Sequence, residues 1–289
     1  MYKENLNIES VVEEPLGLFP NDVGIKPFLK WAGGKTQLLS HLHKYAPIAF
    51  NKYIEPFIGG GAMFFSLNAE NSIISDSNEE LVITYQQIQS NVDQVISHLR
   101  TFRNEEEFYY EIRQLNPIDL ELSFRAARLI YLNKTCFNGL YRVNKKGHFN
   151  VPYGKGNGNF LHEEVLQNAN EFLQNTIIQL GDYLTVLNQR AEPGDFVFLD
   201  PPYYPVGKHS DFKRYTKEFF YHEDQVRLKE EFDRLVNLGC YVLLTNSDHE
   251  VILDLYSEYE IKIIETKRMI SSNAKTRTGK DIIVIGHND

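Results

Sequence analysis

Cysteine is scarce in this sequence: the 289 residues contain only Cys136 and Cys240. Neither belongs to a CxxC pair and neither lies among histidines, so the sequence offers no disulfide framework and no zinc site. Carboxylates are not clustered at metal-binding spacing either, and we expect no metal. This cysteine usage is typical of a protein from the reducing cytoplasm.

Long apolar runs are also missing. No stretch of about 18 apolar residues occurs, so we expect no helix that spans a membrane. The N-terminal segment is polar and acidic and lacks the apolar core of a signal peptide. We therefore expect a flexible tail over residues 1–23.

An excess of positive charge, the usual signature of a nucleic-acid-binding protein, is absent as well. The formal net charge is −9 at pH 7. Three stretches nevertheless run basic, at 142–155, 208–217 and 267–280. Any one of them is equally well explained as a solvated loop, but all three flank the motifs described below. Because phosphate neutralisation is a local effect, they indicate a positive face despite the acidic total.

Apolar strand candidates alternate with helical stretches along the chain. The candidates are residues 52–57, 72–75, 176–180, 195–199, 240–244, 261–265 and 281–285. This alternation predicts an α/β fold with a mainly parallel sheet and helices on both faces. The last two candidates could pair as an antiparallel hairpin. Four candidates end in glycines or polar residues, and ligands of such sheets bind beyond the carboxyl ends of the strands.

The interval between the second and third strand candidates is about a hundred residues long, too long for one crossover helix. It shows helical periodicity over 81–115 and 122–132, followed by a polar, glycine-rich stretch. In that stretch, residues 144–147 are typical of a β-hairpin turn. We therefore predict an inserted module with a basic hairpin arm at 84–172, within a domain formed by 24–83 and 173–289.

The sharpest motif is Asp200-Pro201-Pro202-Tyr203, directly after the apolar run 195–199. The exocyclic amine of a nucleobase is a poor nucleophile because its lone pair is delocalised into the ring. If the Asp200 carboxylate and the Pro201 carbonyl accept its two N–H bonds, electron density returns to the nitrogen. The prolines stiffen the loop, and Tyr203 can stack on a base that has left the duplex. An Asp-Pro-Pro turn that merely caps the strand is the alternative.

A second motif, YIEPFIGGGA at 53–62, runs from a strand into a glycine-rich turn. Such a turn lets the backbone approach a nucleoside closely, although this one is not the G-x-G-x-x-G dinucleotide fingerprint. Asp76 ends the next strand. A carboxylate there can accept hydrogen bonds from ribose hydroxyls, or it can equally cap the following helix.

The segment KWAGGKT at 30–36 is not a P-loop. A P-loop needs a glycine five positions before Gly34, where this chain has Leu29. The segment also precedes the first predicted strand of the sheet instead of following it. Trp31 and Lys35 could still hold the amino-acid end of a ligand.

Together these motifs resemble the Dam-type DNA adenine methyltransferases, in the group whose target-recognition domain lies between the cofactor and catalytic motifs. The likeness runs from about residue 26 to the C-terminus, and its segments are FLKWAGGK at 28–35, EPFIGGGA at 55–62, NGLYR at 138–142, FNVP at 149–152, DPPY at 200–203 and DQ at 224–225. The resemblance implies a Rossmann-like class I methyltransferase sheet whose last strand is antiparallel. It also implies S-adenosylmethionine as cofactor and methyl transfer to N6 of adenine in double-stranded DNA, by base flipping and direct in-line transfer.

The resemblance implies roles for individual residues. Trp31 and Lys35 would contact the methionine portion of the cofactor, Asp76 its ribose and Asp182 its adenine. The other expected cofactor-binding residues are Glu55, Phe57, Gly59, Gly61, Tyr183 and Asp200. The expected catalytic residues are Asp200, Pro201, Pro202 and Tyr203. The expected DNA-binding residues are Phe137, Asn138, Arg142, Asn144, Lys146, Asn150 and Pro152. The segment that would close over a flipped base, or simply pack the next helix, contains Phe212, Tyr215 and Phe219.

Specificity and partners stay open. The common target of the family is adenine within GATC, but His148 occupies a hairpin position that is often acidic. The same fold could methylate the N4 amine of cytosine, although Asp200 favours adenine. RNA or protein substrates usually go with asparagine at that position, and an inactive DNA-binding module is a further alternative. We expect a monomer, with a cognate restriction enzyme as a potential partner.

Overall fold

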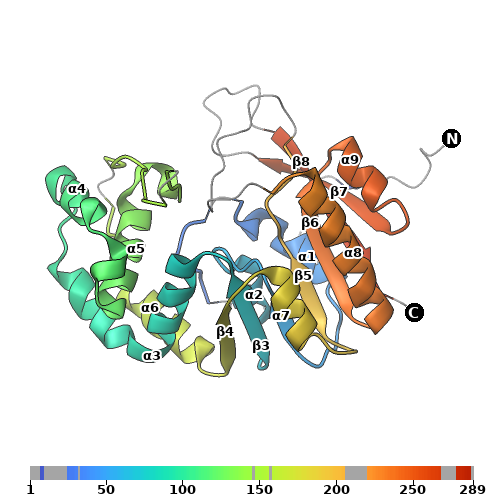
Figure 1. Cartoon of the computed structure of the whole chain (residues 1–289), viewed down its shortest axis with the longest axis horizontal. Helices are drawn as coiled ribbons and strands as arrows, with labels where there is room; N and C mark the ends of the chain where they lie inside the picture. The colour runs from blue at the N-terminus through green and yellow to red at the C-terminus, as the bar shows by residue number, and fades with distance from the viewer. Residues whose placement is uncertain are drawn as a thin grey trace.

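The computed structural model describes residues 7–9, 25–31, 33–144, 147–155, 158–205, 220–267 and 278–287. Within these residues, eight strands form one sheet in the order β1-β7-β8-β6-β5-β2-β3-β4. They are β1 (Asn7–Glu9), β2 (Tyr53–Glu55), β3 (Ser72–Asp76), β4 (Thr176–Leu180), β5 (Phe196–Leu199), β6 (Tyr241–Ser247), β7 (Glu260–Lys267) and β8 (Thr278–Gly286). Only β8 runs antiparallel to its neighbours, between β6 and β7 (Figure 1).

The predicted mainly parallel sheet and the antiparallel pairing of its last two strands are confirmed. Two details differ from the sequence analysis. Strand β6 continues through 245–247, where the sequence predicted that it had ended, because these polar side chains are buried like the rest of the strand. Residues 7–9 of the expected tail form β1 beside β7, a backbone pairing with Asn7 opposite Lys262 that three residues of sequence cannot signal.

Helices cover both faces of the sheet (Figure 1). The α-helices of the described residues are α1 (Leu39–Tyr45), α2 (Ala62–Leu67), α3 (Glu79–Thr101), α4 (Glu106–Gln114), α5 (Leu122–Thr135), α6 (Glu163–Leu173), α7 (Tyr183–Arg190), α8 (His222–Leu238) and α9 (Glu250–Leu255), of which α4 and α5 lie beyond the β4 edge of the sheet. Short 3-10 turns are η1 (Lys35–Leu38), η2 (Pro117–Asp119) and η3 (Phe137–Gly139). None of the helices described here combines the length and the apolar character needed to cross a membrane.

The core splits into two clusters because successive side chains on a strand point to opposite faces. In β5, Phe196 and Phe198 join the cluster that contains residues of α1, α2 and α3. Val197 and Leu199 join the cluster that contains residues of α7, α8 and α9. All four are at most 1% exposed, so β5 is buried on both faces, as its continuous apolar run predicted.

The interval between β3 and β4 contains α3 to α6 and the hairpin. Figure 1 shows these helices together at the β4 side of the sheet, away from β7 and β8. Helix α3 begins at Glu79 and packs along α5 and α6, so the module start expected at 84 falls inside this helix. The predicted hairpin turn is confirmed: Val143 pairs with Phe149, and the Gly147 amide donates to the Asn144 carbonyl at 2.9 Å.

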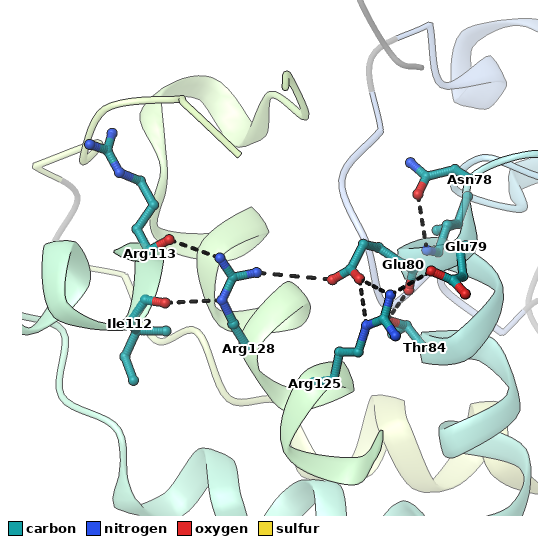
Figure 2. Close-up of polar contacts among 9 residues, drawn as sticks. Asn78, Glu79, Glu80, Thr84, Ile112, Arg113, Arg125 and Arg128 are labelled. Atoms are coloured by element: carbon teal, nitrogen blue, oxygen red, sulfur yellow. Dashed lines mark hydrogen bonds and ion pairs between the residues drawn. The ribbon is translucent and has the colours of Figure 1, made fainter. Parts of the chain in front are cut away.

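An ion cluster joins three helices of this interval close to the end of β3 (Figure 2). Arg125 of α5 donates through Nη2 to Glu79 at 2.8 Å and through Nε to Glu80 at 2.5 Å. Glu79 and Glu80 are the first two residues of α3, directly after its N-cap Asn78. Arg128, one turn further along α5, donates to two backbone carbonyls at the end of α4. Three helices are thus joined within one turn of the carboxyl end of β3.

We expect Arg125→Met to lower the free energy of unfolding by about 3 kcal/mol, because it leaves the mostly buried Glu80 without its main counter-ion. Arg100→Met is the matched control, since Arg100 and its partner Glu163 are both exposed, at 62% and 41%. The control should lose far less of its free energy of unfolding, because solvent screens an exposed ion pair. Urea unfolding measures both, and equal losses would show that burial does not set the contribution of the Arg125 pairs.

Candidate active site

The Asp200-Pro201-Pro202-Tyr203 loop leaves the sheet at the carboxyl end of β5. The Asp200 side chain is 20% exposed, and its Oδ1 lies 2.7 Å from Nζ of Lys35. The same oxygen accepts a hydrogen bond from the Thr245 hydroxyl at 2.7 Å. Thr245 belongs to the neighbouring strand β6, so the strand order itself brings a donor to this carboxyl.

Lys35 reaches the loop from the start of η1, far away in the sequence. Its side chain is 6% exposed, and Nζ also donates to the Gly33 carbonyl. Nζ lies 4.7 Å from the centroid of the Tyr203 ring, a cation–π distance. The structure therefore brings Lys35 together with Asp200 and Tyr203, a contact that the sequence analysis did not anticipate.

The glycine-rich turn after β2 lies against Trp31. Gly59 and Gly61 both have positive φ, of 47° and 69°. A Cβ on Gly59 would lie 2.8 Å from Cδ1 of Trp31, and a Cβ on Gly61 would lie 2.8 Å from the Tyr85 hydroxyl. Both positions thus need glycine for conformation and for space, which fits a turn packed closely on its surroundings.

Asp76 lies beside this turn at the end of β3. Its Oδ2 accepts from the Gly59 amide at 3.3 Å, and its Oδ1 accepts from the Asn78 amide at 2.9 Å. Burial raises the pKa of Asp76 to about 6, against the lowering effect of these backbone donors. The helix-cap role that the sequence left open for Asp76 belongs to Asn78, whose side chain accepts from the Leu81 amide.

Glu55 ends β2 and is a buried carboxyl, 2% exposed. It accepts a hydrogen bond from the Tyr53 hydroxyl at 2.6 Å. Burial raises the pKa of Glu55 well above its ordinary value and the Asp200 carboxylate adds to the rise, while the Tyr53 hydrogen bond opposes it. Three acids therefore gather at the carboxyl edge of the sheet: Glu55, Asp76 and Asp200.

Aromatic side chains follow β2 and β4. The rings of Phe57 and Tyr183 have centroids 5.0 Å apart, and Phe220 lies within 6.4 Å of both. Asp182 is the exposed N-cap of α7, where it accepts from the Leu184 amide at 2.9 Å. An open hollow of about 510 Å³ adjoins the Asp200-Pro201-Pro202-Tyr203 loop and is lined by Tyr204, Pro205 and residues 220–223.

The hairpin packs against the segment at 30–36 through two stacked aromatic rings. Trp31 and Tyr141 are stacked with centroids 4.9 Å apart and planes 22° apart. Arg142, next along the chain, donates through Nε to Oδ1 of Asn150 at 2.7 Å and through Nη2 to its carbonyl at 3.3 Å. Asn144 accepts the His148 amide at 3.1 Å, which closes the turn.

Three predicted DNA-binding residues lie at the base of the hairpin. Phe137 is 50% exposed, and its amide donates to the Pro152 carbonyl at 2.9 Å. Asn138 is exposed with φ of 55°. Lys146 lies outside the described residues, as do Phe212, Tyr215 and Phe219 and the basic stretch at 208–217.

Sequence reasoning missed three polar residues behind the loop. Thr245, Asn246 and Gln225 are each 0% exposed. Gln225 donates to the Pro202 carbonyl at 3.1 Å, and Asn246 accepts from the Tyr204 amide at 3.1 Å. The available signal was the polar triplet at 245–247 after an apolar strand, together with the DQ pair at 224–225.

These features define a class of protein. A mainly parallel sheet with one antiparallel strand carries a glycine-rich turn after β2, an acid at the end of β3 and Asp-Pro-Pro-Tyr after β5. This combination is that of a Rossmann-like methyltransferase.

Comparison with known proteins specifies the class further. Residues 31–270 match the family described as D12 class N6 adenine-specific DNA methyltransferase. The chain is 40% identical over 278 residues to the Type II methyltransferase M1.LlaDCHI of Lactococcus lactis subsp. cremoris, covering 92% of this chain and 97% of that one. It is 41% identical over 276 residues to the Type II methyltransferase M.MjaIII of Methanocaldococcus jannaschii, covering 88% and 95%. It is 31% identical over 260 residues to the DNA adenine methylase of Escherichia coli K12, covering 89% and 93%.

The chain therefore belongs to the D12 class of N6 adenine-specific DNA methyltransferases. This confirms the sequence-based expectation of an adenine-specific DNA methyltransferase.

Replacing Glu55 tests how much the burial of its carboxyl group destabilises the folded protein. Since the folded protein holds the Glu55 proton more tightly than the unfolded chain does, the wild type should lose stability as pH rises above about 5. Glu55→Gln keeps an acceptor for Tyr53 but carries no charge. We expect its thermal unfolding midpoint to exceed that of the wild type by a margin that widens as pH rises. Glu111→Gln, on the exposed face of α4, should show no such margin, and a pH-independent difference for Glu55→Gln would contradict the assignment.

Proposed function

We propose that this protein transfers the methyl group of S-adenosylmethionine to N6 of an adenine flipped out of double-stranded DNA, by direct in-line transfer. The observation that carries this proposal is the Asp200 carboxyl, held at the carboxyl end of β5 by Thr245 and Lys35. When bound, S-adenosylmethionine supplies a methyl group already activated on a sulfonium, so no covalent intermediate with the protein is needed.

The loop supplies acceptors for the target amine. Both described contacts of Asp200 fall on Oδ1, and we assign Oδ2 to accept one N–H bond of the adenine amine. The Pro201 carbonyl accepts the other, so the nitrogen lone pair is free to attack. Tyr203 stacks on the flipped base, and Pro201 and Pro202 keep the acceptors in place because their φ angles are fixed. The proton lost after transfer passes to water.

The carboxyl edge of the sheet fits a nucleoside cofactor. The turn at Gly59 and Gly61 has positive φ and carries no side chains at these two positions, which supports close approach of its backbone to a nucleoside. We assign Asp76, at the end of β3 beside this turn, to accept from ribose hydroxyls. We assign exposed Asp182 to accept from the adenine amine. Phe57 and Tyr183 provide an aromatic wall for that base. Glu55 and Asp200 complete the proposed cofactor-binding set.

Trp31 and Lys35 are assigned to the methionine portion of the cofactor. Lys35 contacts Asp200 in this structure. The two roles are compatible because an ammonium group has three donors. Lys35 would then lie between the cofactor and the catalytic loop, where it contributes to both.

The hairpin is assigned to DNA. Arg142 is braced by Asn150, which holds the planar guanidinium in one orientation, as recognition of a base edge or phosphate requires. Phe137, Asn138 and Pro152 form an exposed group beside it that can wedge into the duplex. The remaining assigned contacts are Asn144 and Lys146.

The relatives support a narrower proposal for target and partners. The resemblance of the motifs to Dam-type enzymes supports GATC as target, with exposed His148 as the departure. Two relatives are named Type II methyltransferases, which supports a cognate restriction enzyme. We propose a monomer, because one flipped base occupies one active site.

Incubation with unmethylated plasmid DNA and S-adenosylmethionine, followed by nucleoside mass spectrometry, tests the reaction. We expect N6-methyladenine, mapped to GATC by modification-sensitive sequencing. Asp200→Asn should reduce the rate at least about 100-fold, because it replaces an acceptor oxygen pair by a group that also donates. Asp254→Asn, an exposed change on α9, should be unaffected. N4-methylcytosine would overturn the target base, and an active Asp200→Asn variant would overturn the mechanism.

The pKa of Asp76 near 6 gives a second test, of cofactor binding. The ionised carboxylate is the stronger acceptor for ribose hydroxyls, so the Kd for S-adenosylmethionine should rise as pH falls below about 6, with a limiting slope near tenfold per pH unit. Asp76→Asn should bind more weakly at neutral pH and lose this dependence. Titration calorimetry across the range measures both, and a wild-type Kd that stays constant would rule out Asp76 as the ribose acceptor.

A further inference from the structure

Two buried amide side chains hold the backbone of the catalytic loop from behind. Gln225 lies in the first turn of α8, Asn246 lies in β6, and both are 0% exposed. Gln225 Nε2 donates to the Pro202 carbonyl at 3.1 Å. Asn246 Nδ2 donates to Gln225 Oε1 at 3.0 Å. Asn246 Oδ1 accepts from the Tyr204 amide at 3.1 Å.

The orientation of both amides follows from their partners. The Pro202 carbonyl only accepts, so Gln225 must direct its NH₂ group toward it. Gln225 then offers its oxygen to Asn246, which must donate in return. The oxygen of Asn246 consequently faces two backbone donors, the amides of Tyr204 and Ser247, the latter at 2.8 Å. Only one orientation of the two amide groups therefore gives every hydrogen bond of this network a donor and an acceptor.

The contacts fall on both sides of Tyr203. The Pro202 carbonyl belongs to the peptide unit before Tyr203, and the Tyr204 amide belongs to the unit after it. The Ser247 hydroxyl donates to the Tyr204 carbonyl at 2.8 Å, which fixes a third unit. Pro201 and Pro202 have no N–H groups, so the loop cannot be fixed by donors of its own at these positions.

A buried amide side chain stabilises the fold less than an apolar side chain of the same size unless all its polar groups are hydrogen-bonded. An apolar side chain of similar size at position 225 or 246 would pack in the core without needing partners, whereas a buried amide loses stability unless every group is paired. The network therefore stabilises the folded protein little more than well-packed apolar side chains would at the same positions. What it does supply is a fixed direction for peptide units next to the proposed catalytic residues.

We propose that Gln225 and Asn246 are positioning residues for methyl transfer. They orient the peptide units that flank Tyr203, and so set the Tyr203 ring and the adjoining Pro201 carbonyl for the target adenine. Neither residue touches the substrate. This inference rests on the proposed function, because it presumes that the loop presents acceptors and a stacking ring to an adenine.

Gln225→Glu separates a positioning role from a merely structural one. A protonated glutamate can donate to the Pro202 carbonyl and accept from Asn246, as glutamine does. An ionised glutamate cannot donate, and it repels the carbonyl oxygen. Turnover of the variant at saturating cofactor and DNA should therefore approach that of the wild type at low pH and fall increasingly below it as pH rises.

Gln225→Met removes the donor at every pH. We expect its turnover to be about 100-fold below that of the wild type throughout the range, the size of effect that a small misplacement of reacting groups produces. The cofactor Kd and the KM for DNA should stay within about threefold of wild type, because neither assigned binding set contains Gln225. Gln189→Glu, an exposed change on α7, is the matched control and should follow the wild-type pH profile.

Asn246→Asp keeps the proposal testable if the variants at 225 do not fold. An aspartate still accepts from the Tyr204 amide, but it draws the Gln225 donor to itself and releases the Pro202 carbonyl. Turnover should fall while Kd and KM hold, and thermal unfolding confirms that each protein assayed is folded.

Different experimental outcomes would overturn the positioning role and the proposed function. Folded variants at 225 and 246 with wild-type turnover at all pH values would overturn the positioning role. So would a loss of turnover matched by equal losses in cofactor and DNA affinity, since that indicates general disruption of the site. A wild-type protein that methylates no DNA would instead overturn the proposed function, and this inference with it.

Discussion

The Asp200 carboxyl is held in place by groups from two other parts of the chain, and the arrangement of the site depends on it. Strand β5 delivers the carboxyl, β6 delivers the Thr245 hydroxyl, and η1 delivers the Lys35 ammonium. The first two meet because β5 and β6 pair in parallel register, with Leu199 opposite Leu244. A slip of one residue would turn the Thr245 side chain to the other face, since side chains alternate along a strand. The register of β5 against β6 therefore determines the position of the Thr245 hydroxyl at Asp200.

The segment that carries Lys35 is itself fixed from the β3–β4 interval. Asn133 of α5 accepts from the Lys30 amide at 2.8 Å and donates to its carbonyl at 2.6 Å. A Cβ on Gly139 would lie 2.7 Å from the Lys30 side chain, so the base of the hairpin packs directly on this segment. Together with the stacking of Trp31 on Tyr141, these contacts connect the hairpin to the cofactor-side motifs. Helix α5 thus contacts two segments that adjoin the site, the one at Lys30 and, through the ion cluster, the start of α3.

The net charge of −9 does not describe the charge at the carboxyl edge of the sheet, because acids there are buried. Burial raises the pKa of Glu55 and of Asp76 because the surroundings disfavour the charged forms. The Lys35 ammonium, almost fully buried itself, pairs with Asp200 and counteracts the rise in the pKa of Glu55. The charge balance that matters is therefore local, and the sign of the total says little about which face meets DNA.

The amino-acid sequence by itself determined the elements and the chemistry of this protein. Local periodicity predicted the strands and the helices of the long interval, because burial on one or two faces leaves a pattern of period two or 3.6 in the chain. The motifs at 55–62 and 200–203 carried the reaction class, since a glycine-rich turn after a strand and an acid before two prolines are read directly from residue identity. Only the tertiary structure decided which distant groups meet. Lys35 against Asp200, Gln225 against Pro202, and β1 against β7 are contacts between segments whose separation no local pattern encodes. Thr245 and Asn246 looked like the polar end of a strand, and the folded sheet placed them inside it, because their side chains find partners in the catalytic loop instead of in water.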